Sequence, residues 1–248
     1  MDFRTLRLQI EGSVARVTLA RPDAANRVNA RMLRELTDAC ETIAADETVC
    51  LTLLTADGPD FCAGWDEALS EDPSRDAFGL IAALPTPIIA AVQGATLSAG
   101  LELALACDVR IAADDARFGL PEVSTGSLPM AGGTQRLPRL VGRSLATSML
   151  LLGDEIDAEA AYRAGLVSRV VPSKQLASEA EALAPRIASH GPLALRYAKE
   201  AIYQGSELSL DQALRYELDL SVILQTTTDR AEGVDAFLEK RPPNFQGR

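Results

Sequence analysis

The pattern of hydrophobic and polar positions divides the chain into an alternating α/β part and a helical part. Short apolar runs bounded by glycine, proline or charged residues predict strands, and runs with a helical period of apolar positions predict helices. Strands are expected at residues 6–10, 14–19, 49–54, 88–92 and 109–112, and helices at 30–45 and 98–107. Strands that alternate with helices at this spacing favour stacked ββα or βαβ turns, an α/β fold.

After about Gly153, every further element that the pattern predicts is helical. Helical patterns cover residues 157–164, 174–189, 193–204, 210–224 and 229–238, and the run Lys240-Arg241-Pro242-Pro243 ends the series. We expect residues 1–190 to form the core. Residues 191–248 are expected to form a C-terminal helical region that packs on the core or on a neighbouring subunit.

Composition excludes several classes of function. The 248 residues carry a net charge of −11, which argues against nucleic acid as a partner because phosphate binding needs a basic face. No apolar run approaches the roughly 20 residues of a membrane span, and the first residues lack the apolar region of a secretory signal. We therefore expect a cytoplasmic protein with no membrane partner.

The cysteines and the single histidine narrow the chemistry further. Cys40, Cys50, Cys62 and Cys107 form no CxxC pair and are expected to be reduced thiols. Cys62 either lines a site or serves as a small buried hydrophobe. His190 lies in a predicted break between helices, and a Ser–His–Asp triad or a multi-histidine metal site would have to use it. We expect no metal site, and proton transfer by carboxylates, Tyr, Cys, Lys or water.

Two tracts of small residues each end on a glutamate, and they carry the candidate chemistry. The first is QGATLSAGLE, ending at Glu102, and the second is FGLPE, ending at Glu122, with MAGGTQ soon after. Small residues let backbone N–H groups approach a ligand, and a nearby carboxylate can move protons. The alternatives are a solvated helix residue for Glu102 and a charge at a helix N-terminus for Glu122.

Two loops that follow predicted strands are placed to supply such N–H groups. Residues 61–66 follow the strand at 49–54, and residues 98–100 follow the strand at 88–92. Two backbone donors that meet at one point stabilise negative charge on a carbonyl oxygen, and losing one costs about 2.7–4 kcal/mol of transition-state energy. Two ordinary turns between strand and helix are the alternative.

Taken in order, these tracts resemble the crotonase superfamily, the enoyl-CoA hydratase/isomerase family. The resemblance runs from Arg21-Pro22-Asp23-Ala24-Ala25-Asn26 through FCAGWDE, AAVQGATLSAGLELALACD, FGLPEVSTGSLPMAGGTQRLPRLVG and AYRAGLVSRVV to AFLEKRPP. It implies a crotonase-like spiral of ββα units whose C-terminal helices build a homotrimer or a dimer of trimers. It also implies an acyl-CoA substrate and no other cofactor, because coenzyme A belongs to the substrate.

By motif position, the resemblance implies a set of site residues. The oxyanion hole falls on the backbone N–H groups of Trp65 and Ala99, and the catalytic pair on Glu102 and Glu122. The residues implied in binding CoA or substrate are Ala25, Arg27, Ala63, Gly64, Asp66, Gly100, Pro121, Met130, Phe237 and Lys240. Phe237 and Lys240 are implied to reach the CoA of an adjacent subunit.

Some of these binding residues have simpler interpretations. Arg27 is expected either to meet a phosphate or to be an exposed arginine at a helix start. For Phe237 and Lys240 the alternative is a buried aromatic ring beside a solvated lysine.

The leading hypothesis is addition of water across the Cα=Cβ bond of an enoyl-CoA, because two carboxyl groups can activate water and protonate the α-carbon. Several departures from the family pattern leave the reaction open: a Ser98-Ala99-Gly100 triplet, Trp65 at a usually small position, Glu67 at an aliphatic one, and Met130 in place of a glycine. The alternatives are an enoyl-CoA isomerase, a hydrolase of a CoA thioester or β-diketone, and a non-enzymatic acyl-CoA-binding or assembly subunit. Mere binding would need neither glutamate.

Overall fold

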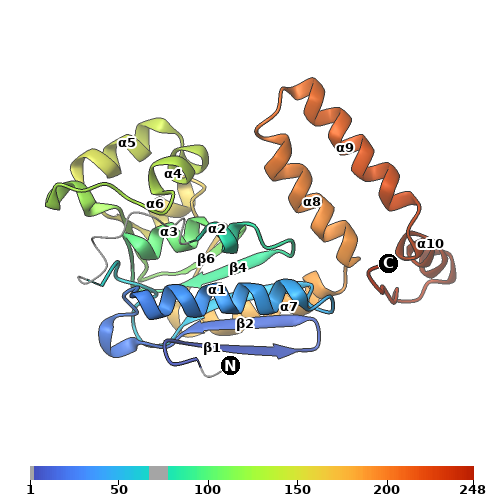
Figure 1. Ribbon diagram of the computed structural model, residues 1–248, viewed down its shortest axis with the longest axis horizontal. Coiled ribbons are helices and arrows are strands. Elements are labelled where there is room, and N and C mark those ends of the chain that lie inside the picture. Colours follow the sequence, from blue (N-terminus) through green and yellow to red (C-terminus); the bar gives the residue numbers. More distant parts are fainter. Residues whose placement is uncertain (1–2, 67–77) are drawn as a thin grey trace.

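The computed structural model describes residues 3–66 and 78–248, which form two sheets covered by helices (Figure 1). The larger sheet has the strand order β1-β2-β3-β4-β6-β9. Strand β1 runs antiparallel to β2, and all later neighbours are parallel. These strands are β1 (Leu6–Glu11), β2 (Val14–Leu19), β3 (Leu51–Ala56), β4 (Ile88–Val92), β6 (Val109–Ala113) and β9 (Arg169–Val171).

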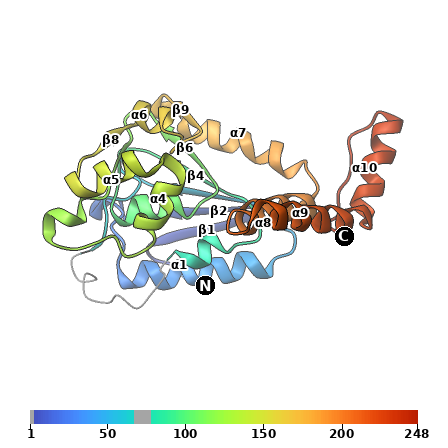
Figure 2. The ribbon, with the colours of Figure 1, turned by 90° about the horizontal axis from the view of Figure 1, so that it is seen from above.

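Helices cover both faces of this sheet, with α1 (Ala30–Ala45) on one face and α7 (Leu176–Ala188) on the other (Figure 2). The side chains of strand β4 alternate between the two faces of the sheet, and helices cover both faces. Every position of the strand is therefore apolar. Ile88 and Ala90 belong to the core cluster that includes α1, whereas Ile89 and Ala91 belong to the cluster that includes α7. The continuous apolar run therefore reports a strand buried on both sides.

A second, three-stranded sheet places the two glutamate-bearing tracts side by side. It has the order β5-β7-β8, with strands β5 (Ala95–Leu97), β7 (Arg117–Gly119) and β8 (Ile156–Asp157). Strands β5 and β7 are parallel, and Leu97 pairs with Gly119. Strand β5 leads into helix α3 (Ala99–Leu105) and β7 into the 3-10 helix η3 (Pro121–Thr125). The segments that carry Glu102 and Glu122 therefore leave the sheet at the same edge.

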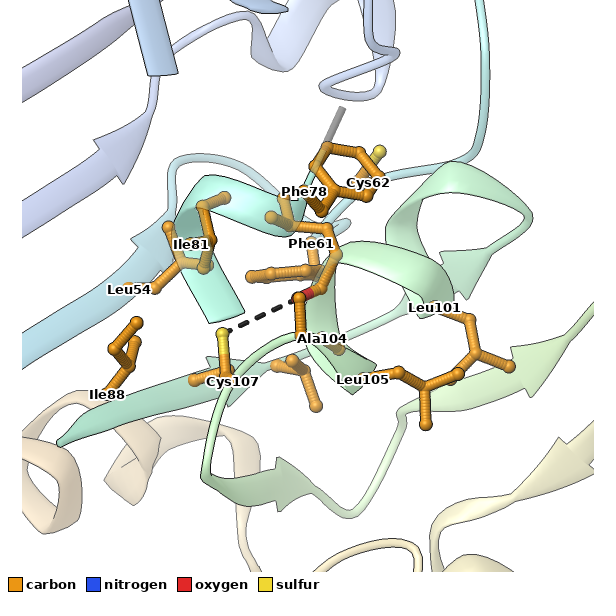
Figure 3. Packing of buried hydrophobic residues seen from close by; sticks show 14 of the residues in the cluster. Leu54, Phe61, Cys62, Phe78, Ile81, Ile88, Leu101, Ala104, Leu105 and Cys107 are labelled. Carbon is orange, nitrogen blue, oxygen red and sulfur yellow. Dashed lines mark hydrogen bonds between the residues drawn. The ribbon is translucent and has the colours of Figure 1, made fainter. Parts of the chain in front are cut away.

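Buried side chains fix α3 against the rest of the core (Figure 3). Phe61, Phe78 and Leu101 are fully buried in the same cluster. The Cys107 thiol donates a hydrogen bond to the carbonyl of Leu103 at 3.5 Å, across the end of the helix. Because α3 is enclosed in this way, a charged side chain on it can reach only the interior or the site.

Most predicted elements are confirmed, with a two-residue shift at β3, which was expected at 49–54 and spans residues 51–56. The expectation that only helices follow Gly153 is wrong, because β8 and β9 lie beyond it and β9 completes the large sheet. These strands have two and three residues, too few to show an alternating pattern.

The sequence pattern also missed α2 (Gly79–Ala82), α4 (Gly133–Val141) and α5 (Arg143–Leu152). Helix α2 is a single turn. Helices α4 and α5 are separated only by Gly142, and Pro138 lies inside α4. A proline inside a helix and a glycine between helices are usually signs of a break, which hid this pair.

Three C-terminal helices extend away from the two sheets (Figure 1). After α6 (Ala158–Arg163) and α7, the chain forms α8 (Pro192–Gly205), α9 (Leu210–Gln225) and α10 (Thr228–Glu239). Lys199 ties α8 to the core: its Nζ lies 2.8 Å from Asp108 Oδ2 and donates to the carbonyl of Thr86 at 3.2 Å. His190 lies in the turn between α7 and α8, as predicted.

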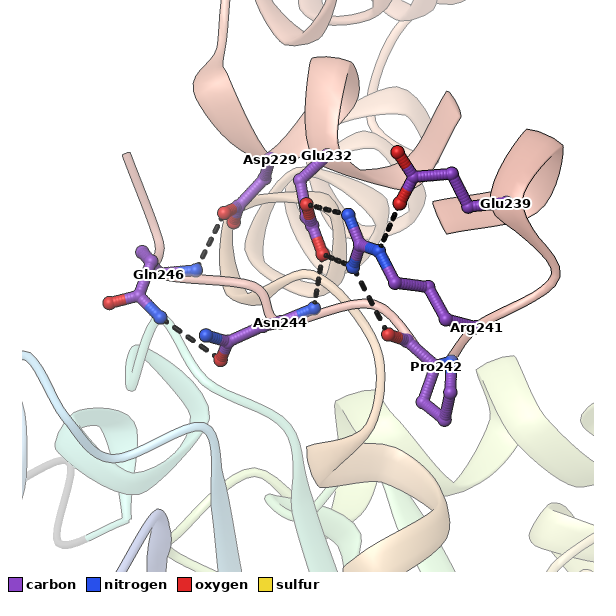
Figure 4. Close-up of polar contacts among 7 residues, drawn as sticks. All are labelled: Asp229, Glu232, Glu239, Arg241, Pro242, Asn244 and Gln246. Carbon is purple, nitrogen blue, oxygen red and sulfur yellow. Dashed lines mark hydrogen bonds and ion pairs between the residues drawn. The ribbon is translucent and has the colours of Figure 1, made fainter. Parts of the chain in front are cut away.

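The C-terminal tail folds back onto α10 through polar contacts (Figure 4). Asp229 accepts hydrogen bonds from the backbone N–H groups of Gln246 at 2.6 Å and Gly247 at 2.9 Å. Glu232 pairs with Arg241 at 2.6 Å, and this hydrogen bond lowers the pKa of Glu232 to about 2. The tail therefore holds a defined conformation on α10.

The four cysteines are free and buried. Burial raises the pKa of Cys40, Cys62 and Cys107 to about 12, so these thiols stay protonated at neutral pH. Cys62 is fully buried in the core, which fits the small-hydrophobe alternative. Across residues 3–66 and 78–248, no helix is both long enough and apolar enough to cross a lipid bilayer.

Candidate active site

A cleft of about 510 Å³ lies where the two glycine-containing loops meet η3. This volume suits a small-molecule ligand. The residues that line it are Arg27, Ala63, Gly64, Trp65, Asp66, Leu97, Ser98, Pro121, Glu122, Ser124, Thr125, Ser127, Leu128 and Met130. Residues from four separate stretches of the sequence therefore share one cavity.

Two glycines allow the loops to converge. A Cβ on Gly100 would lie 2.1 Å from the carbonyl oxygen of Cys62, so no other residue fits there without displacing the chain. Gly64 has a φ of +120°, and a Cβ on it would lie 3.1 Å from that of Ser98. Backbone hydrogen bonds lock the approach, since the Leu97 N–H donates to the Cys62 carbonyl at 3.0 Å. The loops at 61–66 and 98–100 thus touch, as the oxyanion-hole hypothesis requires.

The backbone N–H groups of Trp65 and Ala99 have no acceptor among the described residues. Trp65 bridges Val28, but that bridge uses the Gly64 carbonyl and the Asp66 N–H, so the Trp65 N–H points away from Val28. Ala99 is the first residue of α3, where an N–H has no partner within the helix. Ala99 itself is fully buried, and its neighbour Ser98 is the residue that lines the cleft.

Residues 25–28 form a wall behind the first loop. The Ala63 N–H donates to the Ala25 carbonyl at 3.0 Å, and the Val28 N–H donates to the Gly64 carbonyl at 2.9 Å. The Arg27 guanidinium lies at the cleft and donates to the Trp65 carbonyl at 3.2 Å. A positive charge is therefore held at the mouth of the cleft beside the first loop.

Glu102 is fully buried, and its carboxylate is held from one side only. Its Oε1 accepts hydrogen bonds from the backbone N–H groups of Ala131 at 2.7 Å and Gly133 at 2.9 Å. Its Oε2 has no hydrogen-bond partner among the described residues. Burial, followed by the charge of Glu122, raises its pKa from about 4.5 to about 7, although the two N–H groups act in the opposite direction. The solvated-helix alternative is wrong.

Glu122 lies on η3 and lines the cleft with only 8% of its surface exposed. Burial raises the pKa of Glu122, while the nearby Ser98 hydroxyl and its own backbone N–H lower it. Neither of its two carboxylate oxygens has a hydrogen-bond partner among the described residues. The charge of Glu122 also raises the pKa of Glu102, so the two carboxyl groups interact. Such a pair can keep one proton near neutral pH.

The departures from the family pattern have structural consequences. The backbone at Ala99 suits an L-residue, and the left-handed conformation falls one residue earlier, on Ser98, with φ of +51°. The Trp65 ring stacks on Phe78, with ring centroids 5.9 Å apart, so it packs toward the core. Met130 is 39% exposed and lines the cleft. Glu67 lies outside the described residues.

Six expected site residues do not line the cleft, and they include Glu102 and Ala99, which are fully buried. Ala25 and Gly100 support it from behind, through the contacts given above. Phe237 and Lys240 lie at the end of α10, and neither lines the cleft. Phe237 is 82% exposed, so the alternative of a buried aromatic ring is wrong for the single chain. Whether Phe237 and Lys240 reach the CoA of a neighbour stays a prediction.

Sequence reasoning missed several contributors to the site. Asn26 is fully buried, and its amide donates to the carbonyls of Asp57 at 2.8 Å and Asp60 at 2.9 Å, which anchors the wall at 25–28. The hydroxyl-bearing residues Ser98, Ser124, Thr125 and Ser127 also line the cleft. The tract Ser124–Ser127 begins two residues after Glu122, and that spacing was the available signal.

The fold and this site are those expected of the enoyl-CoA hydratase/isomerase family, which the sequence resembles, and comparisons with known proteins agree. The model of the enoyl-CoA hydratase/isomerase family matches residues 9–248. The chain therefore belongs to this family, within the crotonase superfamily.

Three relatives illustrate the similarity. A protein of Escherichia coli (strain K12) named 2,3-dehydroadipyl-CoA hydratase is 44% identical over 241 residues, which cover 94% of each chain. A crotonyl-CoA hydratase of Syntrophomonas wolfei is 41% identical, covering 99% of each chain. The crystal structure of an enoyl-CoA hydratase from Bacillus anthracis superposes with a TM-score of 0.93 at 38% identity, covering 99% of this chain and 100% of that one.

Proposed function

We propose that this protein is an enoyl-CoA hydratase that adds water across the Cα=Cβ bond of an enoyl-CoA thioester. The observation that carries the proposal is the interacting pair Glu102 and Glu122 beside a cleft, next to two backbone N–H groups that have no acceptor in residues 3–66 and 78–248. The hydratase names of relatives that match nearly the whole chain support the same reaction.

In the proposed reaction, the N–H groups of Trp65 and Ala99 bind the thioester oxygen and stabilise the enolate that forms. The ionised carboxyl group of the Glu102–Glu122 pair takes a proton from water as the hydroxyl oxygen bonds to Cβ. The protonated carboxyl group then gives its proton to Cα. One proton enters the pair and one leaves it, so the pair ends with the protonation count with which it began.

We propose that Arg27 meets a phosphate of coenzyme A, because its guanidinium lies at the mouth of the cleft. Ala25, Ala63, Gly64 and Asp66 shape the adjacent wall, and Pro121 and Met130 border the acyl side. The reaction needs neither a metal ion nor a redox group, since carboxyl groups and backbone N–H groups supply each proposed role. We propose a cytoplasmic location.

The direct test is turnover of crotonyl-CoA and 2,3-dehydroadipyl-CoA, substrates that the names of the relatives suggest. We expect a product heavier by one water, at a rate unchanged after treatment with a metal chelator. Mass spectrometry of the product separates the alternatives, because isomerisation conserves mass and hydrolysis splits the molecule. Tight acyl-CoA binding without any turnover would instead support a non-enzymatic subunit.

We further propose that the C-terminal helices join copies of this chain into a homotrimer or a dimer of trimers. Large hydrophobic side chains are exposed along α8, α9 and α10: Ile202, Tyr203, Leu210, Leu214, Leu218, Val222, Ile223, Val234, Phe237 and Leu238. An apolar surface of this extent marks an interaction site. Phe237 and Lys240 would then approach the CoA of the neighbouring subunit.

The proposed oligomer can be tested by its mass and by the effect of a charged substitution in its interface. Light scattering should give three or six times the 26.4 kDa of one chain. Leu214→Asp should lower that mass, because it buries a charge in the interface. Gln9→Glu adds the same charge on an exposed residue of β1 and should leave the mass unchanged. A wild-type mass of 26.4 kDa at micromolar concentration would contradict the proposal.

A further inference from the structure

The turn at residues 131–133, which leads into helix α4, holds the Glu102 carboxylate. The backbone N–H groups of Ala131 and Gly133 donate to Glu102 Oε1 at 2.7 and 2.9 Å. Helix α4 begins at Gly133, and its N-cap residue, Gly132, has no side chain that could cap the helix. The carboxylate of Glu102 therefore accepts the first N–H of α4, and its position depends on the conformation of this turn.

Two glycines allow the turn to approach the carboxylate. Gly132 has φ of +102°, in the left-handed region that favours glycine. A Cβ on Gly133 would lie 2.9 Å from that of Pro129 and 3.1 Å from Glu102 Oε1. Consecutive glycines restrict the backbone little, so they do not by themselves fix the direction of the N–H groups. That restraint must come from a residue outside the turn.

Arg136 restrains the turn through two hydrogen bonds. Its guanidinium Nη1 donates to the Ala131 carbonyl at 2.7 Å, and its backbone N–H donates to the Gly132 carbonyl at 2.7 Å. The Gly132 carbonyl belongs to the same peptide unit as the Gly133 N–H, and the Ala131 carbonyl belongs to the peptide unit before it. The guanidinium also packs against Gly132, where a Cβ would collide with Nη1. Arg136 therefore fixes both peptide units that lie between the two donors to Glu102.

We propose that Arg136 is a positioning residue for Glu102: its guanidinium fixes the Ala131 carbonyl, keeps the Ala131 and Gly133 N–H groups aimed at Oε1, and so leaves Oε2 for proton transfer. The inference rests on the proposed hydratase function and deepens it. Arg136 is not among the residues that line the cleft, so it acts through the turn and not on the substrate.

Substitution of Arg136 separates this role from substrate binding. Arg136→Met removes the guanidinium and keeps an unbranched apolar side chain. We expect it to lower kcat about tenfold, as for loss of one hydrogen bond from a charged donor, and to change KM less than about twofold. The matched control is Arg139→Met on the same helix. The Arg139 guanidinium donates to the Gln135 carbonyl at 2.9 Å, within α4, so this variant should keep wild-type kcat.

Amide hydrogen exchange gives a readout that does not depend on turnover. The Ala131 and Gly133 N–H groups are bonded to a buried carboxylate, so they should exchange slowly in wild type. We expect their exchange to be at least about fivefold faster in Arg136→Met and unchanged in Arg139→Met. Arg136→Gln, whose uncharged side chain is shorter, should give the same changes and replaces Arg136→Met if that variant does not fold.

Unchanged exchange at both N–H groups, wild-type kcat, or an effect on KM alone in the Arg136 variant would overturn the inference. The proposed function can fail separately. If wild type hydrates no enoyl-CoA while exchange is faster in the Arg136 variant, the hydratase proposal fails and the role of Arg136 in holding Glu102 stands.

Discussion

Replacement of Glu102 or Glu122 by glutamine is expected to lower kcat by about 10²–10⁴-fold, the range for loss of a positioned general acid or base. Glutamine suits position 102 because its carbonyl oxygen can accept the hydrogen bonds from Ala131 and Gly133 that Glu102 Oε1 now accepts. The amide cannot exchange a proton with water or with Cα. The fold and the oxyanion hole stay in place while proton transfer is lost.

Steady-state kinetics with crotonyl-CoA measures this effect. KM is expected to change only a few-fold, because the proposed CoA contacts lie elsewhere in the cleft. The double variant should lose little more than the worse single variant, since two groups that work as a unit are not additive. Glu47→Gln, at an exposed position after α1, is the matched control and should retain wild-type kcat. Retention of more than a tenth of wild-type kcat in both single variants would exclude the proposed mechanism.

The second large effect is on stability as a function of pH. Burial raises the pKa of Glu102 from about 4.5 to about 7, so the folded state binds this proton more tightly than the unfolded state. Below pH 4.5 the carboxyl group is protonated in both states and carries no penalty. As pH rises from 4.5 to 7, the carboxyl group ionises in the unfolded state but keeps its proton in the folded state. The free energy of unfolding therefore falls by about 3 kcal/mol in total by the time the folded state also ionises. Wild type is therefore expected to lose stability between about pH 4.5 and 7.

Urea unfolding of wild type and Glu102→Gln at matched protein concentration, from pH 5 to pH 8, tests this. The variant cannot titrate at position 102, so its advantage over wild type should be small at pH 5 and approach about 3 kcal/mol at pH 8. Glu47→Gln should follow the wild-type curve. A constant difference between wild type and Glu102→Gln across this range would contradict the assignment of a raised pKa. The same substitution is thus expected to abolish activity and to stabilise the fold, as at many active sites.

Much of the site was predictable because its chemistry depends on short, contiguous tracts. Glu102 follows a run of small residues, and its neighbours in the predicted helix are all apolar. The sequence alone therefore indicated a buried carboxylate. The loop at 61–66 and the pair Glu102 and Glu122 were assigned from motifs whose order resembles one family. The cleft is lined by Glu122 and by residues 63–66 of the loop, and Glu102 is buried within range of the charge of Glu122.

What escaped prediction depends on contacts between distant segments. Strands β5 and β7 have three residues each and no readable pattern, yet their pairing places the Glu102 and Glu122 segments side by side. Asn26 resembles any polar loop residue until the carbonyls of Asp57 and Asp60 are placed around its amide. The triplet Ser98-Ala99-Gly100 was recognised as a departure from the family pattern, but only the structure shows that the positive φ falls on Ser98 and not on Ala99.

The sequence alone determined the family, the alternation of strands and helices, and the identity of the two carboxylates, because each of these is encoded by local periodicity or by a contiguous motif. The tertiary structure decided that Glu102 is held by the N–H groups of Ala131 and Gly133, that burial raises its pKa, and that Arg136 bonds to the turn that carries those N–H groups. Those properties arise from desolvation and from hydrogen bonds between residues far apart in the chain. A linear pattern carries neither the distances nor the dielectric environment that set them.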